Sequence, residues 1–403
     1  MLKLLTLWII LGVICQDSLV CFGASLAGAR FQSRLFGGQK AEVIARGFFI
    51  LRPSSSNFWP GFLAGPEFIC EEDRVLAVLG KTPSDSFWRF QREVFSLVKI
   101  SEAWLISTGS KQVVVGVLDS GIEVTHEDLS SNIFFNRNEI LNGRDDDGNG
   151  YIDDIRGANA ATMNGSIEDT IGHGTHVAGI LGAVGNNRKG IAGVNWKVTI
   201  LPLKVVDSNG SIKLSSVIRA YNYVLDLRER GVNIRVLNAS FGGYQSGGGV
   251  ERAAIRELLN ADVILVAAAG NDGINISRTP IYPASYELVN VVSVGSIYSS
   301  NGKPFVSSFS NFGKAVKIGA PGENIASTFL DNEYALGSGT SMATPVVAGA
   351  LGLYFSVRKK ASVRRALSDL YKSCRKHSHL AQKIKDGCVL DVARLLRRAR
   401  RST

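Results

Sequence analysis

The sequence contains few cysteines and methionines and only one long apolar run. Its 403 residues include five cysteines, ten prolines and three methionines, which excludes a disulfide-dense scaffold and a proline-rich linker protein. Apolar residues make up 45% of the chain and charged residues 20%, which excludes an intrinsically disordered protein. The 43 glycines predict many tight turns or close backbone approaches. The composition is that of one large globular domain with shorter appended segments.

The one long apolar run lies at the N-terminus. It spans Leu4–Cys15, follows Lys3 and leads into small residues that end at Ala29. This pattern predicts a secretory signal peptide over residues 1–29, with an uncleaved anchor as the alternative. Because no later run is as long, we expect no transmembrane segment in the mature chain. We expect an extracellular, periplasmic or cell-envelope location.

Two of the five cysteines fall in the predicted signal peptide, which leaves Cys70, Cys374 and Cys388. If a segment carrying Cys70 is later removed, Cys374 and Cys388 form the one remaining pair, in a compartment where disulfides persist. The alternatives are two free thiols, or pairing of either one with Cys70. We expect the bond between Cys374 and Cys388 in the mature protein.

The net charge of +10 is concentrated near the C-terminus, for example in Arg358–Lys360 and Arg397–Arg401. Such clusters can attract nucleic acid, anionic lipid or polyanionic cell-wall material. A solvated helix face is the simpler interpretation. We therefore expect no nucleic-acid partner.

The chain changes its pattern at about residue 100. Residues 30–97 show no sustained alternation of strand and helix patterns, and we expect them to form a separate small prosegment. Farther on, short β-branched runs alternate with helix-length amphipathic stretches; the runs are Val113–Leu118, Val198–Val206, Ile234–Leu237, Val263–Ala269 and Val289–Val294. This alternation predicts an α/β domain over residues 98–396, with a doubly wound, mainly parallel sheet sandwiched by helices. Residues 397–403 are expected to be a free basic end.

Three segments place reactive side chains at predicted strand and helix ends. Asp119 directly follows a strand, His173 precedes a small-residue helix, and Ser341 opens a helix after a glycine-rich approach. The carboxyl ends of the strands form the site of a doubly wound sheet, so the three side chains are expected to meet there. Taken singly, each has a structural alternative, namely a capping Asp119, a metal or core pair of His173 and His176, and an N-capping Ser341. No helical HExxH metal signature is present.

Taken together, the three residue types fit nucleophilic catalysis. A serine hydroxyl is a weak nucleophile until a neighbouring imidazole takes its proton. A carboxylate fixes the tautomer of that imidazole and stabilises the imidazolium. Ser341, His173 and Asp119 are therefore the candidate nucleophile, base and orienting carboxylate.

In order and spacing, Val117–Ile122, Gly172–Gly179 and Gly339–Gly349 resemble the three signature segments of the subtilisin family of serine peptidases. The resemblance extends over most of the chain. It implies the subtilisin-like three-layer fold, a serine endopeptidase activity, and the catalytic roles already given to Asp119, His173 and Ser341.

The resemblance also implies an oxyanion donor and a substrate strip. Val266–Asn271 resembles the stretch whose asparagine donates to the tetrahedral oxyanion, which implies that role for Asn271. The residues implied to contact the substrate are Asn209, Gly210, Ser240, Phe241, Gly242, Ala268 and Gly270. Because the walls of the first specificity pocket carry no acid, we expect an apolar or uncharged side chain before the scissile bond.

An acidic loop lies between Asp119 and His173. Its spacing matches the first nine positions of an EF-hand loop, although Arg156 stands where a glutamate would close the loop. The expected Ca²⁺ ligands are Asp145, Asp147, Asn149, Tyr151 and Asp153. A solvated acidic loop is the alternative. The resemblance implies a second calcium site that includes Asp128, and no redox or nucleotide cofactor is expected.

These features predict a secreted, autoprocessed serine endopeptidase that acts through an acyl-enzyme. Its expected partners are extended polypeptide substrates and its own prosegment as an intramolecular inhibitor, and we expect a monomer. One alternative is a catalytically silent binding protein on the same scaffold, which an intact set of Asp119, His173, Ser341 and Asn271 disfavours. Another is an enzyme whose main task is acyl transfer to an amine, as in peptide ligation.

Overall fold

The computed structural model describes residues 80–244 and 248–401, together with the backbone of four earlier strands. The chain divides into two compact units, Met1–Val78 and Leu79–Thr403. In the first unit, the sheet order is β2-β3-β1-β4 and all pairs are antiparallel. Its strands are β1 (Leu19–Gly23), β2 (Ala41–Ala45), β3 (Phe48–Leu51) and β4 (Phe68–Glu72).

The predicted signal peptide over residues 1–29 contains β1, so the structure places five of its residues in this sheet. Its other residues, most of the predicted prosegment and the side chain of Cys70 lie outside the described residues. The signal peptide and the prosegment therefore stay predictions.

The second unit is built on a sheet of order β15-β16-β12-β10-β9-β8-β5-β7-β6, with β11 paired to β10 beside this path. From β16 to β6 the neighbouring strands are parallel. The strands are β5 (Gly109–Asp119), β6 (Ala158–Asn159), β7 (Lys197–Lys204), β8 (Ile234–Ala239), β9 (Ile264–Ala268), β10 (Val291–Ser300), β11 (Lys303–Val306), β12 (Ile318–Pro321), β15 (Arg375–Lys376) and β16 (Cys388–Val389). A separate hairpin pairs β13 (Ile325–Thr328) with β14 (Tyr334–Gly337).

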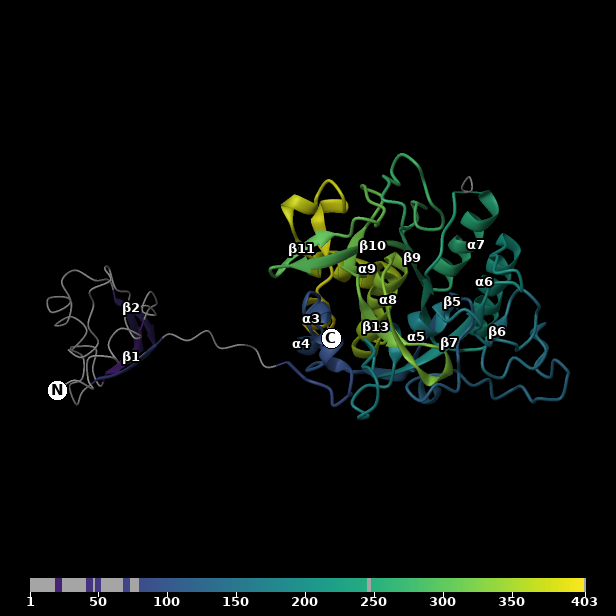
Figure 1. Ribbon diagram of the computed structural model, residues 1–403, viewed down its shortest axis with the longest axis horizontal. Coiled ribbons are helices and arrows are strands. Elements are labelled where there is room, and N and C mark those ends of the chain that lie inside the picture. The colour runs from purple at the N-terminus through teal and green to yellow at the C-terminus, as the bar shows by residue number, and fades with distance from the viewer. Residues whose placement is uncertain are drawn as a thin grey trace. The chain divides into compact units, whose positions relative to one another are not determined.

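Helices cover both faces of this sheet (Figure 1). They are α3 (Trp88–Ser96), α4 (Ile100–Ala103), α5 (His173–Gly182), α6 (Leu214–Glu229), α7 (Gly249–Asn260), α8 (Thr340–Val357), α9 (Val363–Ser373) and α10 (Val392–Arg401). Successive side chains of a strand point to opposite faces. Accordingly, Val115 and Val117 of β5 belong to the core that contains α5 and α8, whereas Val114 and Leu118 belong to the core that contains α6 and α7. The predicted three-layer α/β fold is confirmed.

Helix α8 is the central helix of one layer. Fifteen of its 18 residues are buried. By length and composition it could cross a membrane, but 83% of its apolar stretch is buried inside the fold. Its apolarity is therefore that of a core helix packed on the strands and on α5 and α10.

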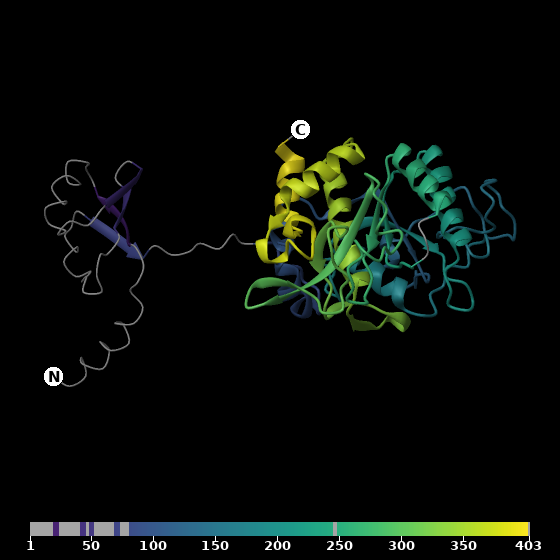
Figure 2. The same ribbon diagram turned by 90° about the horizontal axis from the view of Figure 1, so that it is seen from above.

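Helix α3 lies in the second unit and buries Trp88, Gln91 and Phe95 on one face. The end of the prosegment at residue 97 stays a prediction. The basic end was expected to be free from residue 397, but α10 continues through Arg401 and buries Ala399. Figure 2 shows the yellow C-terminal helices packed together.

The structure joins Cys374 and Cys388 in a disulfide, with their Cα atoms 5.4 Å apart. The predicted bond is therefore present. It ties the end of α9 to β16, the strand beside β12. Within the bridged loop, Leu380 and Ile384 are buried, so the loop packs on the core.

Candidate active site

Three segments bring Asp119, His173 and Ser341 to the carboxyl edge of the sheet. Asp119 ends β5, His173 is the first residue of α5, and Ser341 is the second residue of α8. Strand β5 pairs with β7 on one side and β8 on the other, so the connections change direction at β5. Ligands bind at such switch points of α/β sheets. The structure thus places the predicted side chains at the position where this fold builds a site.

Asp119 and His173 are in direct contact. Asp119 Oδ1 lies 2.6 Å from His173 Nδ1. The Asp119 side chain is 5% exposed and the His173 side chain is 35% exposed. One edge of the His173 imidazole therefore contacts a buried carboxylate. Burial lowers the pKa of His173, but the charge of Asp119, the hydrogen bond to it and the charge of Asp169 together raise this pKa above its ordinary value. The pair therefore favours uptake of a proton by His173.

Asp169 is a buried carboxylate that we did not predict. Its two oxygens accept five hydrogen bonds of 2.8–3.0 Å, from Ser120 Oγ, from the backbone N–H groups of Ile171, Gly172 and Thr175, and from Thr175 Oγ1. These bonds tie the first turn of α5 to the residue that follows Asp119. An acidic residue just before a helix start is a recognised N-terminal pattern and could have identified it.

Ser341 and Ser240 are joined by two hydrogen bonds. Ser341 Oγ donates to Ser240 O at 3.0 Å, and Ser240 Oγ donates to Ser341 O at 2.9 Å. Asn238 Nδ2 donates to Ser240 Oγ at 2.9 Å. The Ser341 hydroxyl must therefore turn away from Ser240 before it can donate to His173.

Asn271 lies beside the start of α8. Its Oδ1 accepts from Thr340 N at 2.8 Å and from Thr340 Oγ1 at 2.9 Å. A Cβ atom added to Gly339 would lie 3.4 Å from Asn271 Nδ2 and 3.6 Å from Ser341 N. Because Gly339 has no side chain, two N–H donors border this point, with Met342 Sδ 3.7 Å from it. This arrangement suits a developing anion.

The predicted pocket walls meet at Ile281, which we did not predict. A Cβ atom on Gly242 would lie 2.8 Å from Ile281 Cγ2, and one on Gly270 would lie 3.0 Å from Ile281 Cδ1. Ile281 and Ala268 are each 3% exposed, and Phe241 is half-buried. The surface between the walls is therefore apolar. No local motif marks Ile281, because it reaches the pocket from a later loop.

Asn209 and Gly210 lie on an exposed turn. Asp207 Oδ1 accepts from Asn209 N and Ser211 N, each at 3.0 Å. Gly210 has a φ of +75° and nothing within 4 Å of an added Cβ. Gly210 N also donates to Asp207 O at 3.0 Å, so the N–H groups of this exposed turn bond within the turn itself.

Glu139, Asp145 and Asp147 form a partly buried acidic cluster in which one ligand oxygen of each lies within 4.8 Å of the others. Glu139 is 5% exposed, and its Oε2 has no hydrogen-bond partner among the residues described. Burial first, and then the carboxylates of Asp154 and Asp147, raise the pKa of Glu139 to about 7 despite a hydrogen bond from the Asp146 backbone. Arg230 Nη1 lies 3.9 Å from Asp147 Oδ1, so one positive charge neighbours the three carboxylates of this cluster.

The other residues predicted as ligands make contacts within or beside the acidic loop. Asn149 Nδ2 donates to Asp154 Oδ2, and the ring of Tyr151 packs against the ring of Tyr223. The Asp153 carboxylate accepts from the backbone N–H groups of Asn142 and Gly143. The EF-hand spacing identifies the loop and two of its clustered carboxylates. It misses Glu139, which precedes the loop.

Asp128 is fully buried and its carboxylate is hydrogen bonded. Its Oδ1 accepts from Asn187 Nδ2 at 2.6 Å, and its Oδ2 accepts from Ile191 N at 2.9 Å and Tyr334 Oη at 3.1 Å. Asp85, which we did not predict, is 5% exposed, and Asp85 Oδ1 has no hydrogen-bond partner within the described part of the chain. Burial, together with the charge of Asp128, raises the pKa of Asp85 to about 6 against backbone hydrogen bonds that lower it.

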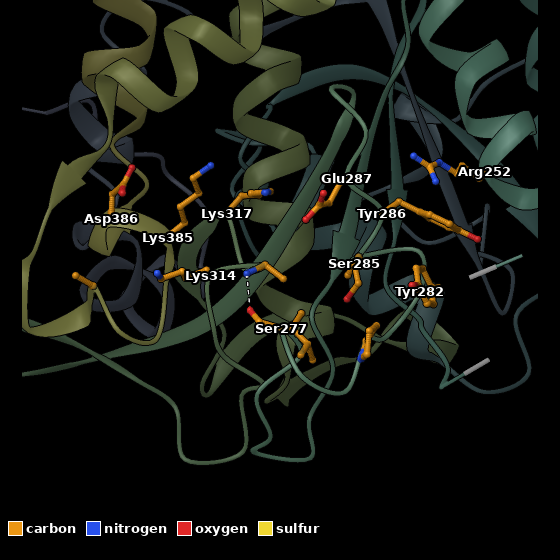
Figure 3. A pocket seen from close by; sticks show the side chains of 15 residues that line it. Arg252, Ser277, Tyr282, Ser285, Tyr286, Glu287, Lys314, Lys317, Lys385 and Asp386 are labelled. Atoms are coloured by element: carbon orange, nitrogen blue, oxygen red, sulfur yellow. Dashed lines mark hydrogen bonds between the residues drawn. The ribbon is translucent and has the colours of Figure 1, made fainter. Parts of the chain in front are cut away.

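A cavity of about 740 Å³ lies apart from these residues (Figure 3). Lys314, Lys317 and Lys385 line it together with Glu287 and Asp386. None of the predicted catalytic, pocket or calcium residues is among its lining residues. This cavity is therefore separate from the predicted site residues.

Comparison with known proteins agrees with this geometry. The chain matches the subtilase family over residues 110–383. It is 35% identical to thermitase of Thermoactinomyces vulgaris over 285 residues, which cover 71% of this chain and 89% of that protein. It is 34% identical to the major intracellular serine protease of Bacillus subtilis (strain 168) over 307 residues, which cover 75% of this chain and 85% of that protein.

Among solved structures, a protease of Pseudoalteromonas arctica PAMC 21717 superposes with a TM-score of 0.62 and 26% identity, over 79% of this chain and 100% of that chain. The family match includes the segments that carry Asp119, His173 and Ser341. The protein is therefore a member of the subtilase family, a serine endopeptidase of the subtilisin type.

Proposed function

We propose that Asp119, His173 and Ser341 are the catalytic triad of this endopeptidase. The observation that carries the proposal is the 2.6 Å contact between Asp119 Oδ1 and His173 Nδ1, at the sheet edge where Ser341 opens α8. On substrate binding, the Ser341 hydroxyl turns from Ser240 O toward His173 Nε2. His173 takes the proton as Ser341 Oγ attacks the carbonyl carbon of the scissile peptide. Asp119 fixes the tautomer and stabilises the imidazolium.

The attack produces a tetrahedral intermediate whose oxyanion accepts from Asn271 Nδ2 and Ser341 N. As the intermediate collapses, His173 gives its proton to the leaving amine, and an acyl-enzyme ester on Ser341 Oγ remains. A water molecule, deprotonated by His173, then attacks this ester. The acid product leaves, and the proton returns to Ser341 Oγ.

The side chain before the scissile bond is proposed to be apolar or uncharged. Gly242, Ala268 and Gly270 border the pocket, and the buried Ile281 lies between them. A lysine or arginine side chain would bury its charge against Ile281 without a partner, which is unfavourable. The exposed turn at Asn209 and Gly210 is proposed to contact an extended substrate.

Secretion and self-processing are also proposed. The N-terminal apolar run supports export. Relatives are found on both sides of the membrane, since one is named a minor extracellular protease and another a major intracellular serine protease. The separate first unit supports a prosegment that Ser341 removes and that inhibits the enzyme until then. We propose that the mature protein is a monomer that acts on polypeptides and needs no nucleic acid.

We further propose that Ca²⁺ binds at Glu139, Asp145 and Asp147, and a second Ca²⁺ at Asp85 and Asp128. Both places offer hard oxygen ligands, and at both a buried carboxylate oxygen, Glu139 Oε2 or Asp85 Oδ1, has no partner in the described residues. A bound cation would balance the charge and stabilise the folded state through its binding free energy.

Calcium binding is tested by measuring bound metal and melting temperature in the inactive Ser341→Ala background. We expect the melting temperature to rise with calcium concentration. Glu139→Gln and Asp85→Asn should each remove about one bound ion. Asp146→Asn, at an exposed neighbour of the cluster, is the matched control and should keep both ions. Equal calcium content in all variants would contradict the two sites.

The triad is tested by the intact mass and the peptidase activity of the Ser341→Ala protein, purified alone. Because one nucleophile is proposed for both reactions, this variant should neither hydrolyse peptides nor lose its N-terminal unit. Adding active wild-type enzyme should restore the cleavage. Normal maturation of the variant by itself would rule out self-processing, and product analysis with added amines would reveal a transferase.

A further inference from the structure

Asn311 is a fully buried residue in the loop between β11 and β12. Its side chain bonds only to the segment that follows β9. Nδ2 donates to Ala269 O at 2.9 Å and to Asp272 Oδ2 at 3.3 Å, and Oδ1 accepts from Asp272 N and Ile274 N, each at 3.0 Å. Both donors and both acceptor positions of the amide are therefore used.

The backbone of Asn311 adds a fifth hydrogen bond to the same segment, because its N–H donates to Gly270 O at 2.9 Å. Gly270 has a φ of +97°, and a Cβ atom there would lie 2.4 Å from Asn311 Nδ2. Only glycine permits this close approach without a shift of the backbone. The five hydrogen bonds of Asn311 thus hold the backbone on both sides of Asn271.

Asn271 itself is fixed through a different set of contacts. Thr340 N and Thr340 Oγ1 hold its Oδ1, and Gly270 N donates to Thr340 Oγ1 at 3.1 Å. The orientation of the Asn271 amide is therefore set from α8, whereas the place of its backbone is set from Asn311. A small displacement of this backbone would move Asn271 Nδ2 relative to Ser341 N.

We propose that Asn311 is a positioning residue for catalysis, which holds Asn271 Nδ2 at the place where the oxyanion forms. This inference rests on the proposed role of Asn271. Asn311 lies too deep to contact substrate, so its effect on the reaction passes through Asn271. Since the oxyanion exists only after attack by Ser341, loss of Asn311 should lower kcat by a larger factor than it raises KM through Gly270 of the pocket wall.

The experiment compares Asn311→Ala, Asn271→Ala and the double variant with the wild-type enzyme. A serine-directed covalent inhibitor counts competent sites, so kcat is expressed per folded molecule. Asn271→Ala should lower kcat by about 10²–10³, a magnitude known from subtilisin. Asn311→Ala should lower it by about 10–10², since a displacement of about 1 Å can have an effect of that size. Inhibition by a peptide aldehyde, which forms a tetrahedral adduct, should weaken in parallel.

The double variant separates a positioning role from a general structural one. If Asn311 acts through Asn271, adding Asn311→Ala to Asn271→Ala should lower kcat by no more than about twofold. Asn290→Ala is the matched control, because Asn290 is equally buried and donates to Ile255 O and Val263 O within the layer of α7. It should lower stability and leave kcat unchanged.

Two results would overturn the inference while leaving the role of Asn271 intact. One is a normal kcat for Asn311→Ala, and the other is a full additive loss in the double variant. A normal kcat for Asn271→Ala would instead refute the proposed oxyanion donor, and the positioning role with it. If Asn311→Ala yields no folded protein, Asn311→Ser replaces it in the same set of single and double variants, because the serine hydroxyl can keep some of the side-chain hydrogen bonds.

Discussion

Ser341 and Ser240 exchange two hydrogen bonds, from Ser341 Oγ to Ser240 O at 3.0 Å and from Ser240 Oγ to Ser341 O at 2.9 Å. The second bond links the end of β8 to the first turn of α8. Ser240→Ala removes it and keeps the carbonyl that the nucleophile contacts. We expect kcat to fall by about tenfold or less, because one hydrogen bond contributes on the order of 1 kcal/mol.

Site titration checks this prediction, since the number of competent sites should stay at the wild-type value. Ser373→Ala is a suitable control. Ser373 is 2% exposed and donates to Leu370 O at 2.8 Å within α9. An equal loss of kcat in both variants would show that the link from Ser240 to Ser341 has no special importance.

The pH dependence of hydrolysis is predicted to depend on Asp169. Activity requires neutral His173, so kcat/KM should rise as the pH passes through the raised pKa of His173. Asp169→Asn removes one charge that raises this pKa, so the acidic limb should move to lower pH. His176 adds no charge in this range, because burial lowers its pKa to about 4.

The matched control for Asp169→Asn is Glu168→Gln, since Glu168 is an exposed neighbour. Solvent screens an exposed charge, so the control should leave the acidic limb in place. A limb that does not move in Asp169→Asn would show that Asp169 serves only to hold the start of α5.

The site residues that can be predicted from the sequence lie within short local sequence patterns. Asp119, His173 and Ser341 each lie in a run of small residues at the end of a strand or the start of a helix, and this run is visible without the fold. Asn311 and Ile281 carry no such pattern, because each acts on a segment that is distant in the chain. Side chains that position other residues are thus recognised only after the fold brings the segments together.

The fold was predicted on the same basis. The alternation of strands and helices after residue 100 predicts the parallel sheet, because each buried strand is a continuous apolar run. The sequence pattern does not show that α3 joins the second unit, because this helix contributes only one amphipathic face to the core. Its Gln91 bonds to Ala192 and Ala326, which lie far away in the sequence.

His176 is predicted to make the protein sensitive to acid. It is 3% exposed, its Nε2 contacts Ala335 O at 3.1 Å, and its pKa is lowered to about 4. An unfolded chain takes up this proton near pH 6.5, whereas the folded chain does not until about pH 4. The stabilisation is therefore complete above pH 6.5 and is lost as the pH falls toward 4, by roughly 3 kcal/mol.

Urea unfolding of the inactive Ser341→Ala protein between pH 7 and pH 4.5 measures this loss. The raised pKa of His173 acts in the opposite sense, since its contribution is complete at low pH and is lost as the pH rises above 6.5. The slope below pH 6.5 should therefore be reduced in His176→Gln. An unchanged slope in that variant would assign the acid sensitivity to other groups.

The last prediction concerns the disulfide between Cys374 and Cys388, which closes a loop with a sequence separation of 14. In the chain-entropy model, a loop of this size restricts the unfolded state enough to stabilise the fold by about 3 kcal/mol. The single change Cys388→Ala is sufficient to open the loop. We expect this variant to unfold at lower urea concentration than its parent, in the inactive Ser341→Ala background.

The buried side chains of the loop make the measurement informative. Leu380 and Ile384 pack on the core, and Ile384 Cδ1 approaches Gly319 of β12 so closely that an added Cβ would lie 2.7 Å from it. The folded loop should therefore persist without the bond, and the loss of stability should come mainly from the unfolded chain. Thiol counting on the denatured mature parent gives the control. Two reactive thiols there would refute the bond and weaken the proposal of export, because disulfides persist in oxidising compartments.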